Sequence, residues 1–214
     1  MTSIALIHAL SASPAPINAA FARLWPEARL MNLLDDSLSR DLADEGRLTT
    51  QIIARFGMLG RYCVGTGVDA ILFTCSAFGP AVDAVAAEHA PLPVHKPNTA
   101  MIDEAVASAG DGRIALLASF APTLTSMLPE FPDPSRVLPV YCEGALEALA
   151  RGDADSHDAI VAEVANKLPD DCTIVALAQF SLARAASRIP TRKGQSILTT
   201  PDCAVLALKH ALSA

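Results

Sequence analysis

The chain has 214 residues, of which 51% are hydrophobic and 5% aromatic, and its formal net charge at pH 7 is −7. This length and hydrophobic content are enough to bury a substantial core, as one large domain or as two smaller lobes. The acidic balance argues against nucleic-acid binding, because no run of Lys or Arg exceeds two residues. No apolar run reaches the roughly 18–20 residues that span a bilayer, so no membrane partner is expected either.

The cysteines and the N-terminal segment indicate the compartment. The five cysteines are odd in number and lack C-x-x-C spacing: Cys63, Cys75, Cys142, Cys172 and Cys203. The N-terminal segment also lacks the basic region and cleavage site of a signal peptide, so a cytoplasmic protein with reduced thiols is expected. The histidines pair with no cysteine at the spacing of zinc ligands, and no G-x-G-x-x-G or Walker sequence occurs. We therefore expect no metal and no cofactor.

Short apolar runs alternate with longer segments of helical period, which is typical of α/β proteins with parallel strands. The sequence predicts the following strands: Ile4–Ala9, Ala28–Leu33, Ala70–Thr74, Leu92–Val94, Arg113–Ala118, Val137–Val140, Thr173–Ala178 and Ser196–Thr199. Apolar residues at helical spacing predict helices over Thr50–Val64 and Asp158–Leu168, and Pro14 predicts the start of another. The run DADSHD (153–158) is interpreted as a solvated turn.

Two pairs of segments resemble each other along the chain. IALIHALSASP (4–14) resembles IALLASFAPTL (114–124), at an offset of 110 residues, and DAILFTCSAF (69–78) resembles TIVALAQFSL (173–182), at an offset of 104. We therefore predict an α/β fold of two pseudo-symmetric parallel-sheet lobes, residues 1–105 with about 200–214 and residues 106–199. Two-lobed folds bind ligands in the cleft between the lobes, at the carboxyl ends of strands, so the active site is expected there.

Polar side chains follow four of the predicted strands, in the segments 11–13, 75–76, 119–125 and 179–181. They supply one thiol, one amide and several hydroxyls, which together with accessible backbone N–H groups suit a carboxylate or a developing enolate. Cys75 precedes a predicted helix start, whose N-terminus is expected to lower the pKa of the thiol; the alternative is a small core side chain. For Ser119, Thr123 and Thr125, the alternative is capping of the helix that follows Pro122, and for Gln179 it is a hydrogen bond to nearby backbone.

At these residues the sequence resembles the aspartate/glutamate/hydantoin racemase superfamily, which includes maleate isomerase and arylmalonate decarboxylase. DAILFTCS (69–76) resembles the first cysteine motif of that family. RIALLASFAPTLTS (113–126) resembles the strand and Thr-rich turn that hold a substrate carboxylate. The resemblance implies two pseudo-symmetric lobes and, in the family pattern, two thiols that face one another across the substrate.

The sequence departs from that pattern at the second thiol. Where the second cysteine is expected, the strand TIVALA (173–178) leads to Gln179, and Cys172 lies at the opposite end of the strand. An amide can neither remove nor return an α-proton at neutral pH, so a symmetric two-thiol racemase is not expected. Three one-thiol chemistries remain open: proton delivery after decarboxylation, covalent attack by Cys75, and racemisation with a second base that the sequence does not identify.

We predict a cofactor-independent isomerase of racemase type that transfers a proton at the α-carbon of a small carboxylate, such as an amino acid or a hydantoin, and that forms a homo-oligomer. Cys75 is the predicted catalytic residue. The predicted substrate-binding residues are Ser11, Ser76, Ser119, Thr123 and Gln179, and the further candidates are His8, Thr125 and Ser181. The alternatives are a decarboxylase of a malonate-type acid, a cis–trans isomerase, and a non-catalytic protein that binds small carboxylates.

Overall fold

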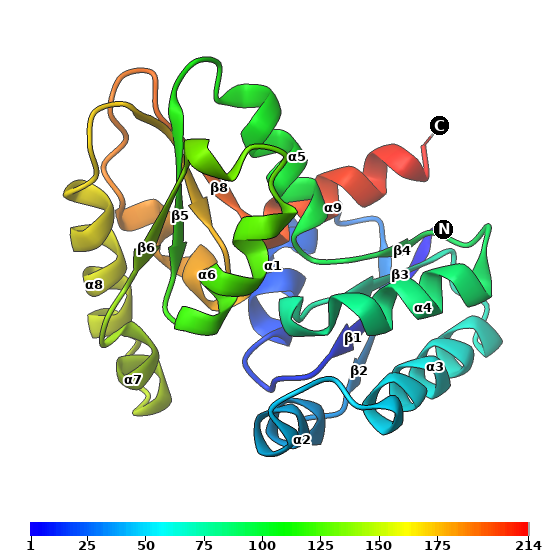
Figure 1. The fold of residues 1–214 in the computed structure, drawn as a ribbon. Coiled ribbons are helices and arrows are strands. Elements are labelled where there is room, and N and C mark those ends of the chain that lie inside the picture. The colour runs from blue at the N-terminus through cyan, green and yellow to red at the C-terminus, as the bar shows by residue number, and fades with distance from the viewer. Residues whose placement is uncertain (214) are drawn as a thin grey trace. The chain divides into compact units, whose positions relative to one another are not determined.

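The computed structural model describes residues 1–213 and divides into two compact units. The first unit contains residues 1–99 and the C-terminal segment from Ala204, and the second contains Ala100–Cys203. Each unit is built on its own four-stranded sheet, in which all neighbouring strands are parallel (Figure 1). The predicted α/β class with two parallel-sheet lobes is therefore confirmed.

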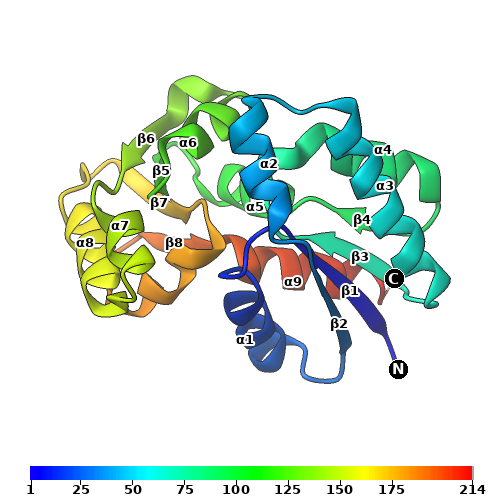
Figure 2. The same cartoon turned by 90° about the horizontal axis from the view of Figure 1, so that it is seen from below.

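The first unit has the sheet order β2-β1-β3-β4. Its strands are β1 (Ser3–His8), β2 (Arg29–Leu34), β3 (Ala70–Phe73) and β4 (Val94–His95). Its helices are α1 (Pro14–Leu24), α2 (Ser37–Glu45), α3 (Thr50–Gly65), the 3₁₀ turn η1 (Ser76–Phe78), α4 (Gly79–His89) and α9 (Thr200–Ala211), which begins in the second unit. Helices α1 and α9 lie on one face of the sheet, and α2, α3 and α4 cover the other (Figure 2).

The second unit has the corresponding order β6-β5-β7-β8. Its strands are β5 (Arg113–Ala118), β6 (Val137–Tyr141), β7 (Cys172–Leu177) and β8 (Ser196–Thr199). Its helices are α5 (Thr99–Ser108), α6 (Ala121–Met127), α7 (Ala145–Ala150) and α8 (Ala154–Asn166), with the 3₁₀ segments η2 (Leu128–Glu130), η3 (Pro134–Arg136) and η4 (Phe180–Arg188). All eight predicted strands are present, with ends that differ from the predictions by no more than a few residues.

The two sheets repeat the same pairing at the offsets found in the sequence. In the first unit Ile7 of β1 pairs with Phe73 of β3, and in the second Leu117 of β5 pairs with Leu177 of β7. Ile7 and Leu117 are 110 residues apart, and Phe73 and Leu177 are 104 apart, which are the two offsets of the repeated segments. Residues that follow β1 and β3 can therefore be compared position by position with those that follow β5 and β7.

The central strands are held by burial on both faces. Five of the six residues in β1 and in β5 are buried, as is usual for parallel strands covered by helices. Alternate side chains point to opposite faces, and Ala5, Ile7 and Ala9 pack on the side of α2, α3 and α4. Burying each large aliphatic side chain contributes about 1.5–3 kcal/mol, which makes these strands the rigid base of the loops that follow them.

The interpretation of residues 153–158 as a solvated turn is wrong. Asp153 caps α8 by accepting a hydrogen bond from the Ser156 N–H (3.1 Å), so the helix begins four residues before the predicted start. His157 and Asp158 are buried, and the Asp158 carboxylate accepts hydrogen bonds from His157 Nδ1 (2.8 Å) and Arg184 Nε (2.8 Å). These partners on α8 and η4 allow the Asp158 carboxylate to be buried where the local composition indicated exposure.

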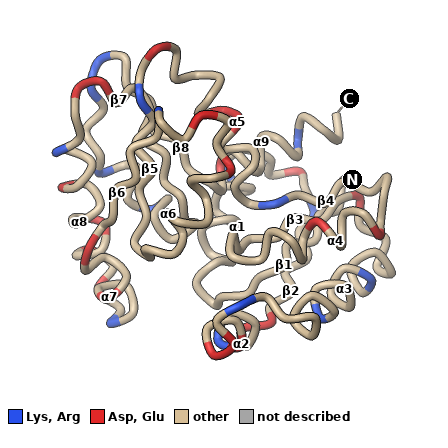
Figure 3. Tube along the Cα trace, viewed as in Figure 1, with Lys and Arg blue, Asp and Glu red and all other residues tan. Residues whose placement is uncertain are grey.

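Charged side chains are distributed over helices and loops of both units (Figure 3). In the first unit Arg55 of α3 forms ion pairs with Asp35 and Asp41, which joins α3 to α2 and to the end of β2. None of the helices among residues 1–213 is both long and apolar enough to cross a membrane. Within the same described residues, no three His, Cys, Asp or Glu side chains are grouped so that they could hold a metal ion.

Candidate active site

Cys75 lies two residues beyond the end of β3 and directly before η1. The last hydrogen bond between β1 and β3 runs from the Thr74 N–H to the Ile7 carbonyl (3.0 Å), and Cys75 continues in an extended conformation with φ −125° and ψ 123°. Since side chains alternate along an extended chain, Cys75 points to the same side as Phe73. The carboxyl end of a parallel strand thus presents the thiol, as the sequence predicted.

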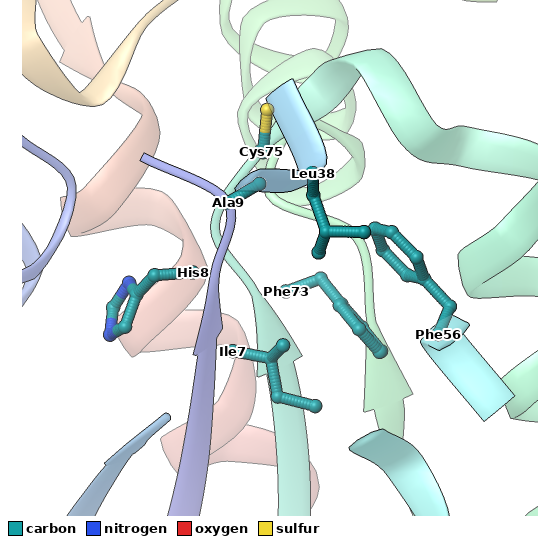
Figure 4. A pocket seen from close by; sticks show the side chains of 7 residues that line it. All are labelled: Ile7, His8, Ala9, Leu38, Phe56, Phe73 and Cys75. Carbon is teal, nitrogen blue, oxygen red and sulfur yellow. The ribbon is translucent and has the colours of Figure 1, made fainter. Parts of the chain in front are cut away.

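The surroundings of the thiol are apolar. Cys75 is half-buried and borders a hollow with no room for a water molecule, lined by Ile7, His8, Ala9, Leu38, Phe56, Phe73 and Cys75 (Figure 4). Burial raises the pKa of the Cys75 thiol, and hydrogen bonds from the Ala77 backbone and the Ser39 side chain offset part of this rise. Near neutral pH the thiol therefore keeps its proton.

The expectation that a helix N-terminus lowers the pKa of Cys75 is wrong. The three-residue turn η1 separates Cys75 from α4, which begins only at Gly79. The field of a helix terminus acts mainly within its first turn, so burial among apolar side chains outweighs it here. Ser39 of α2 was not singled out in the sequence. Its hydroxyl has one proton, which is directed either to the Ala9 carbonyl (2.9 Å) or to the Cys75 sulfur, and either bond fixes α2 next to the thiol.

The other predicted residues of the first unit differ in exposure. Ser11 is exposed in the loop after β1, and Ser76 is half-buried at the first position of η1. His8, the last residue of β1, is fully buried, and its ring points to the side of β1 opposite Ile7 (Figure 4). Its Nδ1 lies 2.8 Å from Thr74 Oγ1 and its Nε2 lies 2.9 Å from Asn32 Oδ1. His8 is thus a bonded core residue on the other face of the sheet from the thiol.

In the second unit, Gln179 occupies the position that corresponds to Cys75. It lies two residues beyond β7, is extended (φ −129°, ψ 146°) and precedes η4. Its Oε1 accepts hydrogen bonds from the Ser119 N–H (2.7 Å) and the Ser119 hydroxyl (3.1 Å). A backbone N–H can only donate, so these bonds identify the amide oxygen and leave the Gln179 NH₂ group free to donate to another acceptor.

The remaining hydroxyls of the second unit do not cap α6. This helix begins at Ala121 with Phe120 at its N-cap position, and no side chain caps it. Ser119 instead holds Gln179, Thr123 is buried within the helix, and Thr125 is exposed. Ser181 is half-buried in η4. The structure therefore brings Ser119 and Gln179 together, while Thr125 and Ser181 make no contact with them that would define a site.

The units differ most at the four equivalent strand-end positions. At one pair of positions the first unit has Ala9 and Cys75 where the second has Ser119 and Gln179. At the pair that precedes them, the first unit has His8 and Thr74 where the second has alanines at 118 and 178. The same backbone frame thus carries a thiol in one unit and an anchored amide in the other.

The other four cysteines are buried, including Cys142, which directly follows the last residue of β6. Burial raises the pKa of Cys63 to about 11 and those of Cys142 and Cys203 to about 12. Cys172 is the first residue of β7, at the end of the strand opposite Gln179. Among the five cysteines, Cys75 alone is not fully buried, so it is the thiol that a small molecule can reach most easily.

No known family model and no curated protein sequence matches the chain. Solved structures do match it in fold. Allantoin racemase from Klebsiella pneumoniae superimposes with a TM-score of 0.74 at 16% identity, over 100% of this chain and 88% of that chain. An aspartate racemase homologue from Pyrococcus horikoshii gives 0.73 at 16% identity, over 100% of both chains.

Glutamate racemase from Thermus thermophilus, solved in complex with β-chloro-D-alanine, gives a TM-score of 0.69 at 17% identity, over 99% of this chain and 80% of that chain. At this level of identity the likeness establishes the fold. The chain has the two-lobed α/β fold of the allantoin, glutamate and aspartate racemases, as the resemblance in the sequence implied.

Two histidines with lowered pKa values predict how stability depends on pH. Burial lowers the pKa of His8, with a partial offset from its Asn32 hydrogen bond, and burial also lowers the pKa of His95, from an ordinary value of 6.5. The unfolded chain then binds more protons below pH 6.5, so the stability that these residues contribute is present above this pH and is lost as the pH falls below it.

We expect the free energy of unfolding, measured by urea titration, to decline below about pH 6.5, and to decline less steeply in a His8→Gln variant, by up to about 1.4 kcal/mol per pH unit. Parallel curves for the variant and the wild type would show that His8 is not buried in its neutral form.

Proposed function

We propose that the protein is a cofactor-independent enzyme of the aspartate/glutamate/hydantoin racemase superfamily, which transfers a proton at the α-carbon of a small carboxylate or related acyl compound. The observation that carries the proposal is the place of Cys75. It is the one cysteine that is not fully buried, and it lies at the carboxyl end of a central strand. The fold around it is that of known racemases.

Cys75 is proposed to act as a proton donor and acceptor. Because burial raises its pKa, the thiol carries a proton that it can deliver to the carbon of an enolate, which breaks the S–H bond and forms a C–H bond. The thiolate that remains is stabilised by the Ala77 N–H and the Ser39 side chain and can take a proton back. One thiol can thus exchange a proton on one face of the substrate.

Gln179 is proposed to hold an oxygen of a carboxylate substrate. Its Oε1 is fixed by Ser119, so its NH₂ group can donate to a carboxylate or enolate oxygen without reorientation. The hydroxyls of Ser11, Ser76 and Thr123 are proposed to supply further hydrogen bonds.

Decarboxylation of a malonate-type acid is a second candidate, because it is favoured by a proton-bearing thiol at Cys75 with an amide, Gln179, at the equivalent position of the second unit. Loss of CO₂ leaves the electron pair on the α-carbon and needs no base. Cys75 would then deliver its proton to that carbon. Cis–trans isomerisation through covalent attack by Cys75 and simple binding without catalysis are the other outcomes that the experiment below distinguishes.

Exposed apolar residues at equivalent strand ends suggest the character of the substrate. Leu10 and Phe120 follow β1 and β5 by two residues and are each 47% exposed. Leu34 and Tyr141 end β2 and β6 and are 44% and 42% exposed. Because exposed apolar residues next to polar groups often mark ligand sites, we propose that the α-substituent of the substrate is apolar.

The proposed function is tested by NMR in D₂O, with amino acids, substituted hydantoins, maleate, and alkyl- and aryl-substituted malonates as substrates. We expect deuterium to enter at the α-carbon with retained chirality, or CO₂ to be lost.

Cys75→Ser should lower the rate about 100-fold or more, because it removes the proton-transfer group. Cys172→Ala, at the far end of β7, is the matched control and should keep the rate. Racemised product would contradict a single-thiol mechanism, and an unchanged rate in Cys75→Ser would contradict a role for this thiol.

The role of Gln179 is tested by Gln179→Glu. This variant keeps an oxygen for the two hydrogen bonds from Ser119 but replaces the donating NH₂ group by a second, negatively charged oxygen. We expect KM for a carboxylate substrate to rise about tenfold or more, since a charge-assisted hydrogen bond is lost and a like charge is added. Ser119→Ala, which keeps the NH₂ group, should raise KM less. Equal KM values for Gln179→Glu and the wild type would exclude contact between Gln179 and the carboxylate.

A further inference from the structure

The residue before Cys75 is bonded to β1 through its side chain as well as its backbone. The Thr74 N–H and the Thr74 hydroxyl both approach the Ile7 carbonyl, at 3.0 and 3.2 Å, and the hydroxyl also lies 2.8 Å from His8 Nδ1. Thr74 is only 5% exposed. The pairing of β1 and β3 ends at this residue, so these contacts are the last that fix the chain before the thiol.

His8 extends the same network to a third strand. Its other ring nitrogen, Nε2, lies 2.9 Å from Oδ1 of Asn32 on β2. With both nitrogens bonded and the side chain fully buried, the ring is held in one orientation. The carboxyl ends of β2, β1 and β3 are thereby tied together by Asn32, His8 and Thr74, on the face of the sheet opposite the thiol.

The second unit has no such network. Its equivalent positions are Ala118 and Ala178, although the backbone bond from the Ala178 N–H to the Leu117 carbonyl (2.9 Å) is kept. Gln179 is fixed from the other side instead, through Ser119. The network therefore accompanies the thiol and is not a general requirement of this strand end.

We propose that Thr74 and His8 are positioning residues, which fix the backbone at the end of β3 and so hold the Cys75 thiol in its place beside Ser39 and Ala77. The importance of this for turnover rests on the proposed function, but the positioning itself does not. Side chains alternate between the two faces of an extended chain. A Thr74 side chain that is held on one face by hydrogen bonds therefore directs the Cys75 side chain to the other face. Loss of the Thr74 side-chain hydrogen bonds lets the segment at Cys75 move out of its apolar surroundings.

The proposal is tested by the rate at which iodoacetamide alkylates Cys75 in the native protein, followed by mass spectrometry of the peptide that contains it. Thr74→Val keeps the shape of the side chain and removes the hydroxyl; Thr74→Ser keeps the hydroxyl and is the matched control. We expect alkylation about fivefold faster in Thr74→Val, as for the loss of about one net hydrogen bond, and a rate near that of the wild type in Thr74→Ser. Asn32→Ala, at an exposed position of β2, should accelerate alkylation in the same direction but less, and it keeps the test available if Thr74→Val fails to fold.

A purely structural role gives a different result. The urea midpoint of Thr74→Val would then fall while the alkylation rate of Cys75 stayed as in the wild type, and this outcome would overturn the proposal. Because no substrate is used, the result is independent of the exchange experiment. Altered alkylation without any proton exchange would retain the positioning role and reject the proposed function.

Discussion

The last hydrogen bond between the two central strands of each unit is the constraint on which the candidate site depends. In the first unit it joins the Thr74 N–H to the Ile7 carbonyl, and in the second the Ala178 N–H to the Leu117 carbonyl. The residue after Thr74 or Ala178 makes no further strand pairing, but the direction of its side chain is still set by the paired residue before it. That position holds Cys75 in one unit and Gln179 in the other, so the rigid buried strands determine where the chemically distinctive side chains begin.

The two units share this frame but support the key residue in different ways. Beside Cys75, β1 is followed by Ala9, and the thiol lies among apolar side chains that keep it protonated. Beside Gln179 the equivalent residue is Ser119, whose two donors fix the amide oxygen. The two equivalent positions of the pseudo-symmetric fold thus hold a protonated thiol in one unit and a fixed amide in the other.

Much of the fold could be predicted because buried parallel strands form continuous apolar runs, such as AILF before Cys75. The equivalence of Cys75 and Gln179 was also visible, as a repeat of segments at nearly constant offset. Features that depend on partners distant in the sequence could not be predicted. The burial of Asp158 requires Arg184, and the bond between Ser119 and Gln179 joins residues 60 positions apart. The raised pKa of Cys75 depends on side chains from three other elements, which the local sequence cannot indicate.

The central claim is that Cys75 and Gln179 are equivalent positions, of which only one now carries a thiol. The most direct measurement is the number of thiols that react with a chromogenic disulfide while the protein stays folded. We expect one in the wild type, on the peptide that contains Cys75. In a Ser119→Ala/Gln179→Cys double variant, which copies the Ala9 and Cys75 arrangement into the second unit, we expect two. A count that stays at one in a folded double variant, or a wild-type label on another cysteine, would contradict the claim.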